Sequence, residues 1–183
     1  MKPGKNRAEL CYSYIYDPSW LTDYEVLTDE LATHIGMACS LLPSGESLAD
    51  IAADLECLQP LAFHANGSIR GKMAIEEADL AWIHERYARY REEAGERLGN
   101  FVLPRGVEPV PQLHLARSIA KKAIRALVRV EAEGRAIPVE LPRFLNLVCN
   151  FCFVLTVVIN LRRGVREPVF ISKSYRYGSG ARN

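Results

Sequence analysis

The stretch PQLHLARSIAKKAIRALVRVEAEG, residues 111–134, decides the fold of this chain. Apolar side chains recur along it every three or four residues, which is the period of an α-helix that buries one face in a protein core. A proline at its first position and a glycine at its last are typical of the start and the end of a helix. The stretch therefore predicts an amphipathic helix over residues 111–133 that stops at Gly134.

The polar face of this predicted helix carries a row of basic side chains. At about 100° per residue, the row covers roughly a third of the helix circumference. Cationic groups one turn apart can bind neighbouring oxygens of one polyphosphate. Most such rows are only a solvated helix face, which the period alone favours, and both interpretations stay open. The row comprises His114, Arg117, Lys121, Arg125 and Arg129. The predicted core face opposite comprises Leu115, Ile119, Ala123, Leu127 and Val130.

A second stretch, LPRFLNLVCNFCFVLTVVIN at residues 141–160, is mostly apolar but contains Asn146, Asn150 and Asn160. It is short for a membrane span and is interrupted by these amides, so we predict a fully buried core helix. A buried amide without a partner costs about 1–3 kcal/mol. We therefore expect the asparagines to bond another helix, another chain or a ligand, and the pattern does not choose among these.

Three further segments have helical periods and end at turn-forming residues, namely 24–42, 47–63 and 74–94. Residues 1–23 have no clear period, which predicts an irregular arm or a short strand. Five helices with short or moderate connections predict an all-α five-helix bundle. We place this bundle at residues 24–166, after an N-terminal arm at 1–23 and before a C-terminal tail at 167–183.

Composition limits the class of partner. A chain of 183 residues with 49% hydrophobic residues and a net charge of +1 predicts one globular domain without a general affinity for nucleic acid or membranes. Five cysteines without framework spacing, and a start without a signal-peptide pattern, predict a cytoplasmic protein. Cys149 and Cys152 have no second pair or histidine nearby in the sequence, so we expect buried thiols and no metal site.

Several short motifs follow one another in a fixed order. They are TDELA at 28–32, FVLPRG at 101–106, LHLAR at 113–117, FLN at 144–146 with FVL at 153–155, and RGV at 163–165 with the tail to Phe170. In these motifs, from about Asp29 to Phe170, the chain resembles the PduO-type ATP:corrinoid adenosyltransferases. The resemblance implies a bundle of the cobalamin adenosyltransferase type that associates as a homotrimer.

The chain departs from this family's pattern in several places, among them Ala32 for an Asn, Leu147 for an Arg and Asn150 for an Asp. Residues 1–24 lack the Thr-Gly-Asp-x-Gly-x-Thr phosphate-binding signature, and the Arg-Arg-Ala-Glu-Arg block stands here as KKAIR at 121–125. A glycine-rich turn allows backbone N–H groups to surround phosphate, so a divergent member would need other donors. The arm offers Tyr12, Tyr14, Tyr16, Lys2 and Lys5.

The resemblance implies that cob(I)alamin attacks the 5′ carbon of ATP and displaces triphosphate, giving adenosylcobalamin at a subunit interface. It implies that Phe101 lies against the lower face of the corrin and that Asp29 pairs with Arg117 across the interface as the catalytic pair. Mg²⁺ would bridge the phosphates without a protein site of its own. The implied ATP-binding residues are Arg117, Lys121, Lys122, Arg125 and Asn146.

The resemblance leaves two functions open. The first is an active transferase, with ATP, a corrinoid and a flavoprotein reductase as partners; the presence of Asp29, Phe101, Arg117 and Asn146 favours it. The second is an inactive relative that binds a corrinoid, another tetrapyrrole or a protein partner in the same subunit cleft. The missing N-terminal signature favours the second.

Overall fold

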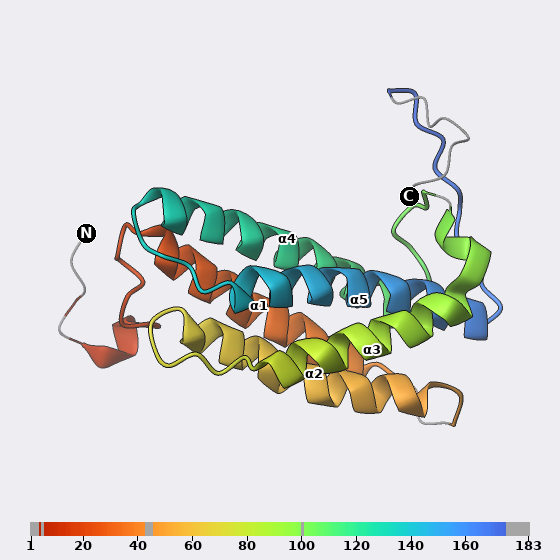
Figure 1. The fold of residues 1–183 in the computed structure, drawn as a ribbon, viewed down its shortest axis with the longest axis horizontal. Coiled ribbons are helices and arrows are strands. Elements are labelled where there is room, and N and C mark those ends of the chain that lie inside the picture. The colour runs from red at the N-terminus through yellow and green to blue at the C-terminus, as the bar shows by residue number, and fades with distance from the viewer. Residues whose placement is uncertain (1–3, 5, 43–45, 100, 175–183) are drawn as a thin grey trace.

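The computed structural model describes residues 4, 6–42, 46–99 and 101–174. Within these residues the only extended pairing is an isolated bridge between Val102 and Val169. The five α-helices are α1 (Trp20–Ser40), α2 (Ala49–Ser68), α3 (Glu77–Ala94), α4 (Val110–Ala132) and α5 (Glu140–Arg162), with short 3-10 helices at Arg7–Glu9, Glu46–Leu48 and Gly95–Gly99. The predicted all-α five-helix bundle is confirmed, and the helices lie roughly along one long axis (Figure 1).

The helices pack so that α1 and α5 lie between the others. Helix α1 contacts α2 and α4, and α5 contacts α3 and α4 (Figure 1). By length and composition α5 could cross a membrane, but 72% of its most apolar stretch is buried inside the bundle. Phe144 and Phe151 of α5 are among the largest fully buried side chains. The apolar stretch is therefore a core helix, but the prediction that it is fully buried is wrong, because Asn146 and Asn150 are exposed.

Helix α1 begins at Trp20, four residues before the predicted start. The side chain of Ser19 caps it by accepting a hydrogen bond from the backbone N–H of Leu21 at 3.2 Å. Glu133, at the end of α4, accepts from the Ser19 hydroxyl at 2.6 Å and from the Trp20 backbone N–H at 3.1 Å. The start of α1 is thus set by a residue more than 110 positions away, which no local pattern indicates.

Helix α2 continues five residues past its predicted end at residue 63. The hydroxyl of Tyr24 donates to the backbone carbonyl of Ala65 at 3.0 Å, and the amide of Asn66 donates to the hydroxyl of Thr28 at 2.9 Å. These bonds to α1 hold the last turn of α2 in place although it contains the turn-forming pair Asn66-Gly67.

The described part of the arm before α1 is irregular apart from the 3-10 helix Arg7–Glu9, and it contains no strand. It folds against Arg70, whose guanidinium lies 3.9 Å from the centre of the Tyr14 ring and donates to Glu25 at 2.8 Å. Burial and the neighbouring Glu25 carboxylate raise the pKa of Tyr12 to about 12. Lys2 and Lys5, which the sequence offers as phosphate donors, lie outside the described residues.

Arg162 joins three helices at the far end of the bundle from this arm. Its guanidinium donates to Asp50 of α2 at 2.6 and 3.0 Å and to Glu93 of α3 at 2.7 Å twice. The Arg162 hydrogen bond is the main cause that lowers the pKa of Asp50. The last turn of α5 is therefore tied to both α2 and α3.

Candidate active site

Helices α4 and α5 run antiparallel, which places the functional candidates of the two helices side by side. The guanidinium of Arg117 lies 5.3 Å from the centre of the Phe153 ring. About one turn further along, Lys121 and Arg117 act electrostatically on Cys149, although burial raises the pKa of this thiol overall. The structure therefore brings Arg117 and Lys121 of α4 to the edge of α5.

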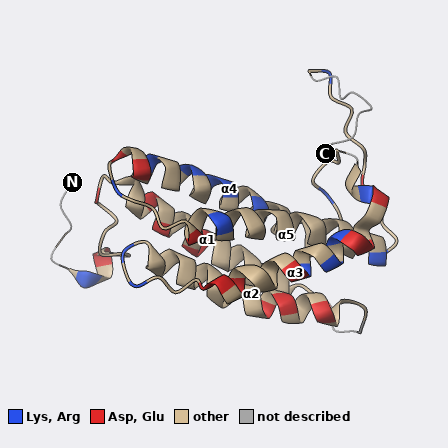
Figure 2. Ribbon diagram, viewed as in Figure 1, with Lys and Arg blue, Asp and Glu red and all other residues tan. Residues whose placement is uncertain are grey.

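The basic residues of α4 form an exposed row along the outer side of the bundle (Figure 2). Arg117 is half-buried, whereas Lys121, Lys122, Arg125 and Arg129 are exposed. Within the described residues none of them forms an ion pair. We call Arg117, Lys121 and Arg125 the α4 row.

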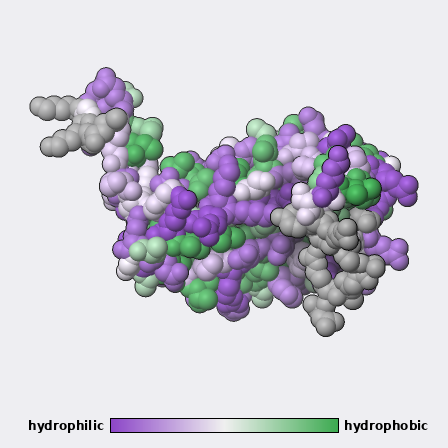
Figure 3. Space-filling model, turned by 90° about the horizontal axis from the view of Figure 1, so that it is seen from above, coloured by the Kyte–Doolittle hydropathy of each residue, from purple (hydrophilic) through white to green (hydrophobic). Residues whose placement is uncertain are grey.

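The basic residues of α4 do not all face the same neighbour. Residues four apart on a helix drift by about 40° at each step. Arg117 therefore lies beside α5, Arg125 faces outward, and the guanidinium of Arg129 lies 3.8 Å above the ring of Trp20 on α1. Lys122 lies about 100° from Lys121, away from α5. Viewed from the α4 side, hydrophilic side chains cross this face with hydrophobic ones between them (Figure 3).

Two predictions for the first turns of α4 are wrong. His114, expected in the exposed row, is only 7% exposed, and Leu115, expected in the core, is 50% exposed. Val110 and Leu113 are also fully buried, so these first turns are enclosed over more of their circumference than the later ones. Burial, with a smaller contribution from the nearby Arg117, lowers the pKa of His114 to about 4.

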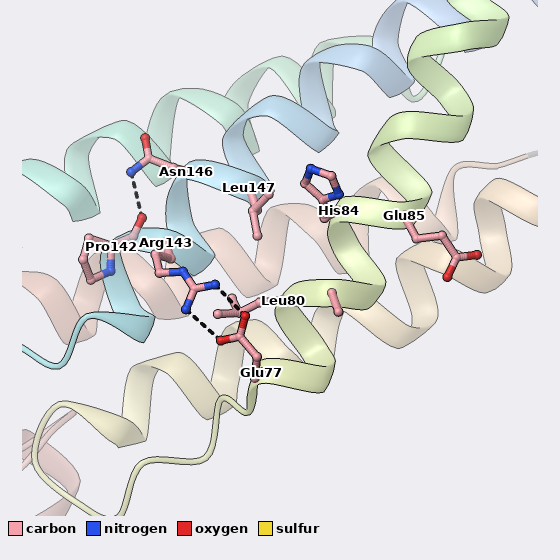
Figure 4. Close-up of a pocket in the computed structure, with 9 residues that line it drawn as sticks. Glu77, Leu80, His84, Glu85, Pro142, Arg143, Asn146 and Leu147 are labelled. Carbon is pink, nitrogen blue, oxygen red and sulfur yellow. Dashed lines mark hydrogen bonds and ion pairs between the residues drawn. The ribbon is translucent and has the colours of Figure 1, made fainter.

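The asparagines of α5 fall into two groups. Asn146 and Asn150 are exposed, so the prediction that they are buried is wrong, whereas Asn160 is fully buried. The exposed pair lies on a strip of α5 between α3 and α4 that no helix of the described residues covers. The amide of Asn146 donates to the backbone carbonyl of Pro142 at 2.7 Å and points away from the Arg143–Glu77 ion pair (Figure 4).

An open groove of about 780 Å³ lies between α3 and the exposed strip of α5 (Figure 4). Asn146 and Leu147 line its α5 side, and His84 lines its α3 side. The guanidinium of Arg143 is paired across it with Glu77 at 2.6 Å. Asn146 therefore stands at the boundary between this groove and the side of α5 that faces α4.

Phe101 lies on the segment 101–109 that leads into α4, which we call the strap. Its side chain is 48% exposed. The strap pairs with the C-terminal tail, because the backbone N–H of Leu103 donates to Pro168 at 2.9 Å and that of Phe170 donates to Phe101 at 2.7 Å. The part of the tail beyond residue 174 lies outside the described residues.

Within one chain the structure does not unite all the predicted site residues. The strap lies at the Asn160 end of α5, about 21 Å from Asn146 at 1.5 Å per residue. Asp29 is exposed on α1 and forms no ion pair with Arg117 in the described residues. The pairing of these two residues across a subunit interface stays a prediction.

Both thiols of the Cys149–Cys152 pair are buried, and burial raises the pKa of Cys152 to about 12. Among the described residues, no three His, Cys, Asp or Glu side chains come together as a set that could hold a metal ion. The positive side chains of α4, the open strip of α5 and the exposed ring of Phe101 therefore characterise the candidate site.

Residues 26–159 match the family described as cobalamin adenosyltransferase. A corrinoid adenosyltransferase from Bacillus subtilis is 30% identical over 144 residues, which cover 76% of this chain and 74% of that protein. A cobalamin adenosyltransferase from Cupriavidus metallidurans is 35% identical over 139 residues, which cover 74% of this chain and 72% of that protein.

Solved structures have the same fold. A variant of a PduO-type ATP:corrinoid adenosyltransferase from Lactobacillus reuteri, complexed with ATP, has a TM-score of 0.76 at 22% identity and matches over 86% of this chain and 90% of its own. A second variant, complexed with cobalamin and ATP, has a TM-score of 0.74 at 19% identity and matches over 89% of this chain and all of its own. The family match and the two relatives show that this chain belongs to the cobalamin adenosyltransferase family.

Proposed function

We propose that this protein transfers the 5′-deoxyadenosyl group of ATP to cob(I)alamin and releases triphosphate. Co(I) supplies the electron pair of the new cobalt–carbon bond and becomes formally Co(III), while the bond between C5′ and the phosphate oxygen breaks and its electrons leave with triphosphate. The observation that carries the proposal is the α4 row, which has no carboxylate partner in the described residues and whose first two members, Arg117 and Lys121, lie at the edge of the open strip of α5.

The α4 row suits the charge that develops in this reaction. Negative charge grows on the leaving triphosphate, and fixed cations lower the energy of that transition state. Arg117 is the best fixed of the three, because it is half-buried and lies over Phe153. Lys121 and Arg125 would bind further oxygens, and Lys122 would do so from the other flank. Asn146 would orient the nucleotide through its exposed amide.

The exposed ring of Phe101 is the part of the site that we propose contacts the corrinoid. An exposed aromatic ring on an anchored strap offers an apolar surface to the lower face of the macrocycle. Such a surface would exclude an axial ligand from cobalt, which makes reduction of Co(II) to Co(I) easier. The electron would come from a flavoprotein reductase.

We also propose a homotrimer whose site is shared between subunits. Arg117 is half-buried and has no carboxylate partner in the described residues, so the accessible part of its guanidinium can pair with an acidic side chain of a neighbouring subunit. Asp29 of an adjacent subunit, exposed on α1, is the partner we propose for Arg117.

Mg²⁺ would enter with ATP. Among the described residues there is no acidic cluster to hold it, and Mg²⁺ commonly binds substrate phosphates and water rather than an all-protein cage. Mg²⁺ bound in this way needs no protein carboxylates, so it is compatible with a site whose charged side chains are Arg and Lys. We place the reaction in the cytoplasm, where the five free cysteines would stay reduced.

The test is an anaerobic assay of the purified protein with chemically reduced cobalamin, with and without Mg-ATP, in which adenosylcobalamin is followed by its absorption spectrum. Product that appears only with ATP is the expected result. A change in the corrinoid spectrum without product would instead indicate an inactive corrinoid-binding relative, which the missing N-terminal signature favours. No change in either case would overturn the proposal.

A further inference from the structure

Asn160 is the fully buried asparagine of α5, and it contacts the strap rather than the exposed strip where Asn146 lies. Its side-chain oxygen accepts a hydrogen bond from the backbone N–H of Val107 at 3.4 Å. Its side-chain amide donates to the backbone carbonyl of Arg105 at 3.4 Å. One side chain therefore binds the strap on both sides of Gly106.

Gly106 fits closely against this asparagine. A Cβ atom at position 106 would lie 2.6 Å from Asn160 Nδ2, closer still to its Oδ1, and 2.8 Å from Val110 Cγ1. These contacts are shorter than van der Waals distance, so a side chain at this position would displace the strap or push the Asn160 and Val110 side chains out of place. The absence of a side chain at Gly106 and the amide of Asn160 together fix the position of the strap.

The strap is also held at its other edge by the C-terminal tail. The Val102–Val169 bridge pairs the strap with the tail, and Arg97 fixes the tail by donating to the carbonyl of Val165 at 3.0 Å. Phe101 pairs with the tail, and Asn160 contacts the strap from the core side at Arg105 and Val107, four and six residues further along the strap. The exposed ring of Phe101 thus projects from a segment that is fixed from two directions.

We infer that Asn160 is a positioning residue for Phe101, which fixes the strap against α5 and so sets the height of the aromatic ring beneath the corrinoid. This inference rests on the proposed function for the role of Phe101, but the anchoring itself does not. Misplacement of a group by about 1 Å can cost about 100-fold in rate. We therefore expect kcat to depend on the position of the strap backbone, and not only on the presence of the Phe101 ring.

The test compares Asn160→Leu, which keeps the approximate size but removes both hydrogen bonds, with Thr156→Val as the matched control. Thr156 is a buried polar residue one turn earlier on α5, and its hydroxyl donates within the helix to the carbonyl of Phe153. We expect Asn160→Leu to lower kcat with cob(I)alamin about 10- to 100-fold while leaving the KM for ATP unchanged. Asn160→Leu should also weaken the electron paramagnetic resonance signal that is typical of Co(II) corrinoid lacking an axial ligand. Thr156→Val should change neither kcat nor this signal.

A second readout does not depend on catalysis. Arg105 is exposed, so trypsin can cut the Arg105–Gly106 bond once the strap leaves its place. We expect this cleavage, identified by fragment mass, to be at least about fivefold faster in Asn160→Leu. If that variant does not fold, as judged by circular dichroism, Gly106→Ala disturbs the same contact from the strap side and should give the same two effects.

The outcomes separate this inference from the proposed function. A wild-type protein that makes no adenosylcobalamin would count against the proposed function, and proteolysis would still decide the anchoring. An active wild type whose Asn160→Leu variant keeps full kcat, or is cut at the wild-type rate, would overturn the inference.

Discussion

Arg117 on α4 and Arg162 on α5 use the same guanidinium group in two different ways. Arg162 is bound to Asp50 and Glu93 and joins three helices. Arg117 has no carboxylate partner in the part of the chain that the structure describes, and its Nε has no hydrogen-bond partner there. The comparison indicates that the cations which hold the fold are paired within the chain, whereas those proposed to bind substrate are left available.

The largest expected effect is that of Arg117→Ala on turnover. Loss of one fixed donor to developing negative charge typically lowers kcat by about 100-fold or more. Steady-state kinetics of adenosylcobalamin formation measure this, and sedimentation analysis of both proteins would show whether the proposed trimer depends on Arg117. Arg89→Ala, on the paired side of the molecule, is the matched control and should keep kcat. Full activity and assembly in Arg117→Ala would show that the α4 row is not the phosphate site.

The next effect is on stability rather than turnover. Arg162→Leu should lower the free energy of unfolding by about 2–3 kcal/mol, because Asp50 and Glu93 lose a shared, partly buried hydrogen-bond donor. Urea unfolding measures the change, and kcat of the folded variant should be that of the wild type. Arg163→Leu, at the next and exposed position, should change stability little. Equal stability of the two variants would contradict the structural role of Arg162.

His114 provides a pH test beside the α4 row. Its folded-state pKa of about 4 lies below the ordinary value of 6.5, so the unfolded chain binds more protons between these values and stability falls as the pH falls through this range. From pH 7 to pH 5 this costs about 2 kcal/mol. Urea unfolding of His114→Leu should lack this part of the pH dependence, whereas His84→Leu, at an exposed position, should keep it. Identical pH profiles for the wild type and His114→Leu would show that His114 is not held neutral.

The smallest effect is expected at Lys121. Its ammonium is exposed and bonds phosphate as a point charge, so Lys121→Ala should raise the KM for ATP about tenfold with a smaller change in kcat. The difference should shrink as salt is added. Cys149→Ala, beside Lys121 on α5, is the control and should alter neither the KM nor assembly. An unchanged KM in Lys121→Ala would restrict the cations of the phosphate site to Arg117, Lys122 and Arg125.

The bundle could be predicted from the sequence wherever local signals set the two ends of a helix. Helix α4 begins and ends within one residue of its prediction, because proline and glycine punctuate a strong apolar period. The start of α1 and the end of α2 could not be predicted, since Glu133 and Tyr24 stabilise them through contacts distant in sequence. Tertiary hydrogen bonds decide where a helix stops when local signals are weak.

The candidate site could be predicted in composition but not in geometry. The α4 row could be predicted from its period of four. His114 is nevertheless buried and Leu115 exposed, the reverse of the prediction, because the first turns of α4 are enclosed differently from the later ones. The asparagines of α5 look alike in sequence, but only Asn160 is buried. Which side chains of α4 and α5 are buried depends on where α3, α4, α5 and the strap lie relative to one another. A helical wheel of one helix does not include this information.

The paired arginine at the end of α5 has a consequence for the evolution of this protein. Because Arg162 and its carboxylates lie away from α4, substitutions along the α4 row can accumulate without unfolding the bundle. A population of such proteins could drift in nucleotide affinity while staying folded, and KKAIR in place of the family's arginine-rich block is the kind of change that this freedom allows.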